Sequence, residues 1–179
     1  MILIYVLLAG SGLWAFGEIV MLSSGQAAAW AGWMATIGLY VAGAGMFALK
    51  DLPAMAKPGR VGIALSAFGA FSFATVYTII LTAGVLGAMA DGTIAHAQMV
   101  YTPFYLLALA FAASGLVSLG LHFRALGDRA GLAGATLLAI LSLGRLILAD
   151  VAAYHEAVSI LVAAYFFWLG IRLLRQRAR

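Results

Sequence analysis

The stretch ILADVAAYHEAVSIL, residues 147–161, interrupts an apolar segment that extends from residue 131 to residue 173. A straight helix over the whole segment would be about 64 Å long, twice the thickness of the hydrocarbon core of a bilayer. We therefore predict that the chain turns here and forms two helices, although the stretch contains neither Gly nor Pro. Asp150 is suited to end one helix and to cap the next, because its carboxylate can accept hydrogen bonds from exposed backbone N–H groups.

The composition of the whole chain predicts an all-α integral membrane protein. Of its 179 residues, 65% are hydrophobic and 9% are charged, whereas soluble domains carry about 25% charged residues. A spanning helix needs roughly 20 apolar residues. The uncharged stretches predict six spans, near residues 2–22, 28–49, 61–89, 99–122, 131–149 and 152–173. We expect a single six-helix transmembrane domain over residues 1–179, with the first span retained because it lacks the basic start of a signal peptide.

The basic residues predict the orientation of the helices, because cytoplasmic connections are enriched in Lys and Arg. Nine of the ten fall on one side of the predicted spans: Lys50, Lys57, Arg60, Arg124, Arg129, Arg172, Arg175, Arg177 and Arg179. We therefore expect both termini to be cytoplasmic, with Arg145 as the exception on the outer side. The abundance of Ala, Gly and Leu and the excess of Arg over Lys are typical of a GC-rich bacterium, which favours the inner (plasma) membrane.

Most of the remaining ionisable residues map to the outer half of the predicted bundle. They are Glu18, Asp91, His96, Asp150, His155 and Glu156. Ionisable side chains within a membrane are costly, and they commonly mark binding sites or ion pathways. The substrate or proton pathway that we predict consists of Glu18, Arg145, Asp150 and Glu156.

Glu18 and Arg145 are predicted to lie at similar depths, each about one turn inside the outer end of its span. One hypothesis is that they form an ion pair that locks two helices together or lines an outer cavity. The alternative is that the two side chains reach the lipid headgroups separately. Asp150 and Glu156 are competing partners for the Arg145 guanidinium.

The two outer histidines, His96 and His155, are the candidate ligands for a metal ion or a haem. The chain has no Cys, which excludes disulfides, thiolate nucleophiles and Cys-ligated clusters. Asp91 and Glu156 could complete a metal site, but adjacent residues such as His155 and Glu156 point about 100° apart on a helix. No metal-binding motif is present, so we predict no cofactor and keep a haem or metal site as the alternative to histidines that hydrogen-bond at the interface.

Glycine and tryptophan suggest how the helices pack and where the membrane surface lies. The glycines expected at helix contacts are Gly38, Gly43, Gly45, Gly62, Gly69, Gly115 and Gly120. Small residues at such spacings let helices approach closely in lipid. Trp14, Trp30 and Trp33 are predicted to form an aromatic belt at the outer membrane surface.

These observations leave several classes of function open. The first is transport, or the binding of a small solute or ion, through the outer ionisable cluster. The second is a membrane subunit of a larger complex, which six Gly-rich helices with little extramembrane mass would suit. The third is a redox protein that uses the histidines. The chain carries no recognisable catalytic motif, so an enzyme is not favoured. The expected partners are the lipid bilayer, further copies of the chain or other membrane subunits, and a small solute or ion, but not a nucleic acid.

Overall fold

The computed structural model describes residues 2–24, 29–50, 55–87, 93–149 and 151–177, with the backbone alone for 85–87, 93–97 and 177. These residues form six helices and no strand: α1 (Ile2–Ser24), α2 (Ala29–Leu49), α3 (Lys57–Gly87), α4 (Thr93–Ala125), α5 (Arg129–Gly144) and α6 (Ala152–Arg177). Within this described part, five helices are long and apolar enough to cross a membrane, and α5 is the shorter exception. The prediction of an all-helical bundle with several helices long and apolar enough to span a membrane is confirmed.

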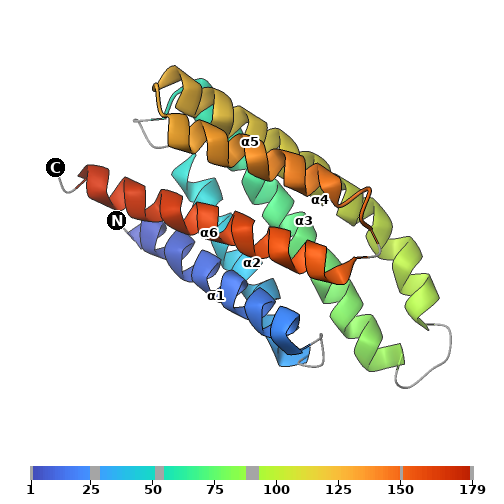
Figure 1. The fold of residues 1–179 in the computed structure, drawn as a ribbon. Helices are drawn as coiled ribbons and strands as arrows, with labels where there is room; N and C mark the ends of the chain where they lie inside the picture. Colours follow the sequence, from blue (N-terminus) through green and yellow to red (C-terminus); the bar gives the residue numbers. More distant parts are fainter. Residues whose placement is uncertain (1, 25–28, 51–54, 88–92, 150, 178–179) are drawn as a thin grey trace.

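The six helices form a ring in the order in which they follow one another along the chain. Each helix packs against the next, and α6 returns to pack against α1 (Figure 1). The contact between α5 and α6 is the least extensive in the ring. Both termini lie at the same end of the bundle (Figure 1), because the chain reverses direction between successive helices.

Close contact between α1 and α2 depends on glycines that face each other across the interface. Gly10 and Gly17 of α1 lie against the backbone of α2, and Gly38 and Gly45 of α2 lie against the backbone of α1. A Cβ atom at any of the four would come within 3.0 Å of backbone atoms of the other helix. In lipid the hydrophobic effect does not drive helices together, so close backbone contact of this kind holds them by van der Waals packing.

The α3–α4 interface is built in the same way. A Cβ atom at Gly62 would approach the backbone at Leu119, and one at Gly115 would approach the backbone and the hydroxyl of Ser66. The expected packing role of glycines is therefore confirmed at these positions. It does not extend to Gly120, where a Cβ atom would make only ordinary contacts.

The helix α5 is shorter than the span predicted from the sequence. We expected a span over residues 131–149, but α5 ends at Gly144, and Arg145 is its C-cap. The N–H of Arg145 donates to the carbonyl oxygen of Ser142 at 3.3 Å, and the N–H of Ile147 donates to that of Gly144 at 3.0 Å. The chain thus turns before Asp150, which lies outside the described residues, and Arg145 is at the end of a helix and not one turn inside a span.

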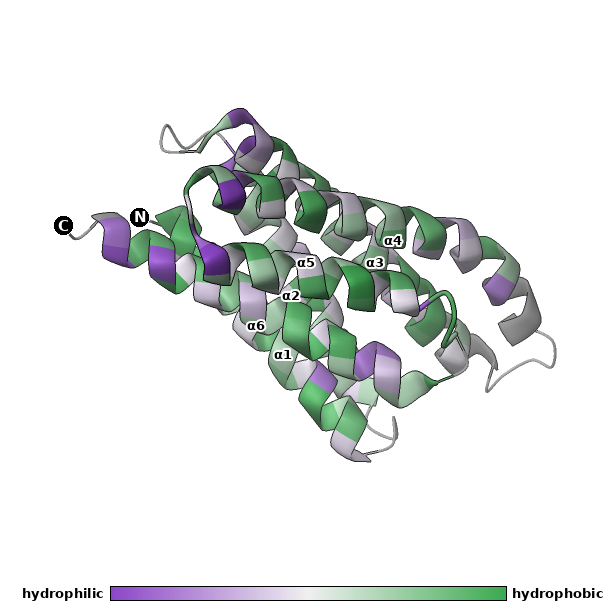
Figure 2. Cartoon of the chain, turned by 45° about the horizontal axis from the view of Figure 1, so that its top comes forward, coloured by the Kyte–Doolittle hydropathy of each residue, from purple (hydrophilic) through white to green (hydrophobic). Residues whose placement is uncertain are grey.

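The helices are predominantly hydrophobic along their length (Figure 2). Several helices carry large exposed apolar side chains, including Ile37, Phe68, Leu121 and Ile140, which are 45–62% exposed. The most hydrophilic segments gather mainly at the end that carries both termini (Figure 2). This pattern is the one expected of a bundle whose sides contact lipid.

An ion pair closes the terminal end of the ring between the α4–α5 turn and α6. Asp128 caps α5, accepting a hydrogen bond from the Gly131 N–H at 3.2 Å, and its other carboxylate oxygen pairs with Arg172 of α6. The Arg172 guanidinium also lies over the rings of Phe123 and Trp168. Burial raises the pKa of Asp128, but the hydrogen bond from Gly131 and the charge of Arg172 outweigh burial and hold this pKa below its ordinary value.

Candidate functional site

Two oppositely charged side chains are buried inside the apolar ring. Glu18 of α1 is 0% exposed and Arg145, at the end of α5, is 4% exposed. Two side chains that reached lipid headgroups separately would be exposed at the end of the bundle, so that reading of the sequence is wrong. Buried charges are stable only when other groups solvate them. Hydrogen bonds and a cation–π contact from the surrounding residues fill this role here.

The Glu18 carboxylate is held by two aromatic donors. The indole Nε1–H of Trp14 donates to Oε1 at 3.1 Å, and the hydroxyl of Tyr77 from α3 donates to the same oxygen at 2.7 Å. The hydroxyl of Ser159 on α6 lies beside both Glu18 and Tyr77. The second carboxylate oxygen, Oε2, has no hydrogen-bond partner in the described part of the chain.

The Arg145 guanidinium joins the end of α5 to the first turns of α6. Its Nη2 group donates to the backbone carbonyl of His155 and to the hydroxyl of Ser159, both at 2.7 Å. Its central carbon lies 5.1 Å from the centroid of the Phe73 ring of α3, a cation–π contact. The Nε atom is buried and, among the residues described, has no hydrogen-bond partner.

Glu18 and Arg145 belong to one cluster but do not form the direct ion pair that was one of our hypotheses. Across the described residues, the direct ion pair is between Asp128 and Arg172, and none joins Glu18 to Arg145. Ser159 links the two charges, because it accepts a hydrogen bond from Arg145 and interacts with Glu18. The two opposite charges also attract each other across the cluster.

Tyr154 and His155 hold the turn between α5 and α6. The Tyr154 hydroxyl donates to the carbonyl oxygen of Leu141 at 2.8 Å, and His155 Nε2 lies 3.0 Å from the carbonyl oxygens of both Leu148 and Ala149. Carbonyl oxygens only accept, so Nε2 carries a proton. Hydrogen bonds from two side chains of α6 to backbone carbonyl oxygens therefore hold this turn, which lies in a stretch without Gly or Pro.

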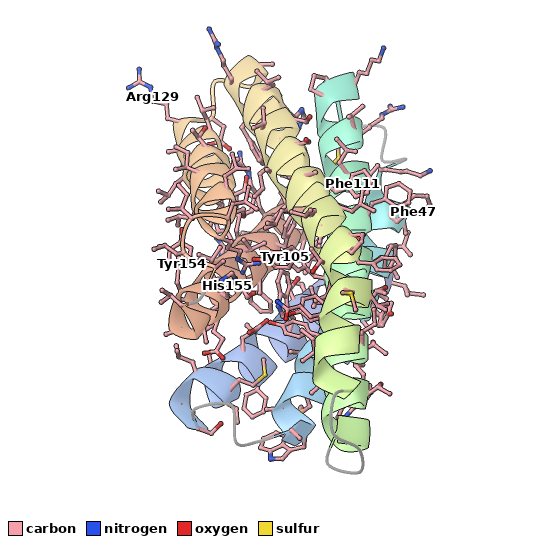
Figure 3. The ribbon with its side chains drawn as sticks, turned by 90° about the vertical axis from the view of Figure 1, so that its right-hand side faces the viewer. Phe47, Tyr105, Phe111, Arg129, Tyr154 and His155 are labelled. Atoms are coloured by element: carbon pink, nitrogen blue, oxygen red, sulfur yellow. The ribbon has the colours of Figure 1, made fainter. Side chains whose placement is uncertain are left out.

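Helix α4 also contacts His155. The hydroxyl of Tyr105 on α4 lies 3.0 Å from His155 Nδ1, and the two side chains point toward each other (Figure 3). With Nε2 directed at two carbonyl oxygens, both ring nitrogens of His155 are occupied by hydrogen bonds. His155 is therefore part of the structural link between α4, α5 and α6.

The other residues predicted for the site fall into two groups. Glu156 is described, on α6, and is 5% exposed. Asp91, Asp150 and the side chain of His96 lie outside the described residues. In the part of the chain whose side chains are described, no three His, Asp or Glu residues are grouped so as to hold a metal ion.

A small cavity lies at the centre of the ring, next to the charged cluster. All six helices or their caps line it, through residues that include Trp14, Met46, Ser66, Leu116, Arg145 and Phe166. About 20 Å³ is open to the centre of a water-sized sphere. The Ser66 hydroxyl, like Arg145 Nε, is buried without a hydrogen-bond partner in the described structure.

Three residues of the cluster were missed or misplaced by the sequence interpretation. Trp14 was predicted to lie in the interfacial belt, but it is 4% exposed and binds Glu18; Trp30 and Trp33 are exposed as expected. Tyr77 and Ser159 were not singled out. A helical spacing of four residues, between Trp14 and Glu18 and between His155 and Ser159, places each pair on one helix face and could have indicated these contacts.

Comparisons with known proteins add no family to this description. No protein-family model matches the chain, and no curated protein or solved structure shows significant similarity to it.

Proposed function

We propose that this protein is a transport or ion-binding membrane protein in which the Glu18–Arg145 cluster handles a proton or a small ion. The observation that carries the proposal is the pair of opposite charges buried inside an apolar ring, each with one polar atom that has no hydrogen-bond partner among the described residues. Charged residues inside a membrane bundle commonly mark ion and proton pathways.

A purely structural role would account less well for the unpaired atoms. Buried polar groups in proteins are almost always hydrogen-bonded, and each exception calls for an explanation. Glu18 Oε2 can accept a proton or a hydrogen bond, and Arg145 Nε can donate one. Both atoms would be satisfied by a group that is bound only during part of a transport cycle.

The hydroxyl groups between the charges suit proton transfer. Tyr77 and Ser159 each have an O–H group that can donate and accept. Tyr77 donates to Glu18, and Ser159 accepts from Arg145 while it lies beside Glu18. A proton that reached Glu18 would therefore have hydroxyl neighbours along which to move.

The same proposal includes the placement of the bundle in the membrane. With both termini in the cytoplasm of a bacterium, the cluster would lie toward the outer side of the inner membrane. All six helices would then cross, and α5, about 24 Å long at 1.5 Å per residue, would be accommodated by local thinning of the bilayer. The basic residues at the terminal end support this orientation.

Proton flux into liposomes tests the proposal. The purified chain is reconstituted with a pH-sensitive dye inside the vesicles, and a pH gradient is imposed. We expect the wild type to dissipate the gradient and Glu18→Gln to lose most of this flux, because glutamine keeps the contacts with Trp14 and Tyr77 but cannot carry a proton. Asp128→Asn, the same chemical change at the opposite end of the bundle, is the matched control and should retain the flux. Equal flux in the wild type and Glu18→Gln would contradict the proposal.

A further inference from the structure

An apolar groove lies between α1 and α6, which pack side by side (Figure 1). Its volume is about 330 Å³, within the range of sites that hold organic molecules. Small residues of α1 and larger residues of α6 line it, including Gly12, Ala15, Ala164, Phe167, Trp168 and Ile171.

The groove opens on the outside of the ring. Phe167 and Trp168 are 39% and 37% exposed, whereas Val162 and Phe166 of the same helix are buried in the core. At 100° per residue, the lining residues of α6 lie on the face opposite the buried ones. The groove therefore faces the surface of the bundle that contacts lipid.

The glycine in the groove is not required by the contact between helices. A Cβ atom at Gly10 or Gly17 of α1 would collide with the backbone of α2. A Cβ atom at Gly12 would meet, among the described residues, the ring of Phe167 alone, at an ordinary distance of 3.8 Å. Gly12 therefore leaves open space beside α6 and does not bring two backbones together.

A positive charge lies at one end of the groove. Arg175 follows Ile171 by four residues and Trp168 by seven, a spacing that places all three on one face of α6. Its side chain is exposed, and it lies about 6 Å beyond Ile171 along the helix axis, toward the terminal end of the bundle. The neighbouring Arg172 already pairs with Asp128.

The length of this arrangement matches one leaflet of a bilayer. Along α6, residues 164 and 175 are about 16 Å apart, and half of the hydrocarbon core is about 15 Å thick. Basic residues at helix ends lie at the level of the lipid headgroups. A lipid whose phosphate met Arg175 would therefore extend its acyl chain along the whole groove.

We propose that the groove between α1 and α6 binds one anionic phospholipid, with an acyl chain against the apolar lining and the phosphate on Arg175. This goes beyond the proposed function and does not depend on it. The apolar lining matches the chain, and the guanidinium matches an anionic headgroup. A second copy of the protein in the same orientation would instead bring its own basic terminal end beside Arg175, and like charges repel.

Native mass spectrometry tests the proposal, because it resolves single lipids bound to a protein. The full chain is purified in detergent and titrated with dioleoyl phosphatidylglycerol, which is anionic, and separately with dioleoyl phosphatidylcholine, which is zwitterionic. The concentration at which half of the protein carries one lipid is compared. We expect the wild type to bind phosphatidylglycerol about fivefold more tightly, the preference that one Arg near an anionic headgroup provides.

Two pairs of variants separate the groove from general contact with lipid. Arg175→Gln should remove the preference for phosphatidylglycerol, whereas Arg124→Gln, an exposed arginine in the last turn of α4, should retain it. Ala164→Leu places a larger side chain in the groove and should weaken phosphatidylglycerol binding. Its matched control is Ala110→Leu, since Ala110 is an exposed alanine of α4 away from the groove.

Three outcomes would overturn the lipid site. Equal binding of the two lipids by the wild type would show contact with lipid in general. Equal losses in Arg175→Gln and Arg124→Gln would show a general effect of positive charge. A dimer that Ala164→Leu separates, with lipid binding unchanged, would place a second copy of the chain in the groove.

Discussion

The hydroxyl of Tyr154 donates a 2.8 Å hydrogen bond to the carbonyl oxygen of Leu141, the acceptor that the N–H of Arg145 would use if α5 continued. The N–H of Arg145 instead donates to Ser142, and the helix ends there. The Tyr154 hydroxyl also occupies the space in which a Cβ atom at residue 144 would lie. An aromatic side chain of α6 thus defines where α5 stops, which explains how the chain turns without a Gly or Pro in the quoted stretch.

Replacing Tyr154 by Phe is expected to destabilise the protein by about 1 kcal/mol, because it leaves the Leu141 carbonyl without its side-chain donor. For a chain of this size, that loss lowers the midpoint of thermal unfolding by about 2–4 °C. The measurement is a melting curve in detergent. Tyr5→Phe serves as the control, since Tyr5 is 54% exposed and should tolerate the change. A Tyr154→Phe midpoint equal to that of the wild type would show that the hydrogen bond does not secure the turn.

The sequence predicted the number and approximate position of the helices because each is a long uncharged stretch between polar breaks. That Glu18 and Arg145 interact was one of two hypotheses from the sequence, since both interrupt apolar segments at a similar distance from the helix ends. The end of α5 could not be predicted, because it depends on Tyr154, a residue ten positions further along the chain. The hydropathy of Leu146 and Ile147 indicates that both residues are apolar, but it does not indicate that the backbone turns there.

The composition of the charged cluster was harder to predict for a related reason. Ser159 and Tyr77 are common residues in membrane helices, and only the ring arrangement brings them beside Glu18. Trp14 was misplaced because a tryptophan near a helix end is typical of the membrane interface. Its position four residues before Glu18 on the buried face of α1 is the better guide.

The link between Glu18 and Arg145 through Ser159 predicts that their substitutions are not additive. Glu18→Gln and Arg145→Gln each leave the other charge buried without its counterpart, while the double variant removes both charges. The double variant is therefore expected to lose less stability than the sum of the two single losses, by roughly 0.5–3 kcal/mol. A double-mutant cycle of unfolding midpoints measures this coupling, and fully additive losses would mean that the two charges are independent.

The glycine contacts between α1 and α2 predict a sharp dependence on position. Gly38→Ala places a Cβ atom against the backbone of Trp14 and should cost about 1–3 kcal/mol, because a helix backbone cannot move away as a side chain can. Gly84→Ala, in α3, meets nothing within 4 Å and should leave the unfolding midpoint unchanged or raise it. If both substitutions had the same effect on melting, close backbone packing would not be what holds α1 against α2.

The ion pair between Asp128 and Arg172 predicts how stability depends on pH at the terminal end. The pKa of Asp128 is lower in the folded protein than its ordinary value of 3.8, so the folded state binds this proton less readily than the unfolded chain does. Its stabilisation is therefore fully present above the ordinary value and is lost as the pH falls through the depressed one. Since Arg172 is 30% exposed, we expect a contribution of about 1 kcal/mol or less, reduced further by salt. Asp128→Asn keeps the helix cap and removes the charge, so the difference in unfolding free energy between the wild type and this variant should be largest near neutral pH and should vanish in strong acid. A difference that stays constant across the acid range would show that the Asp128 charge does not stabilise the fold.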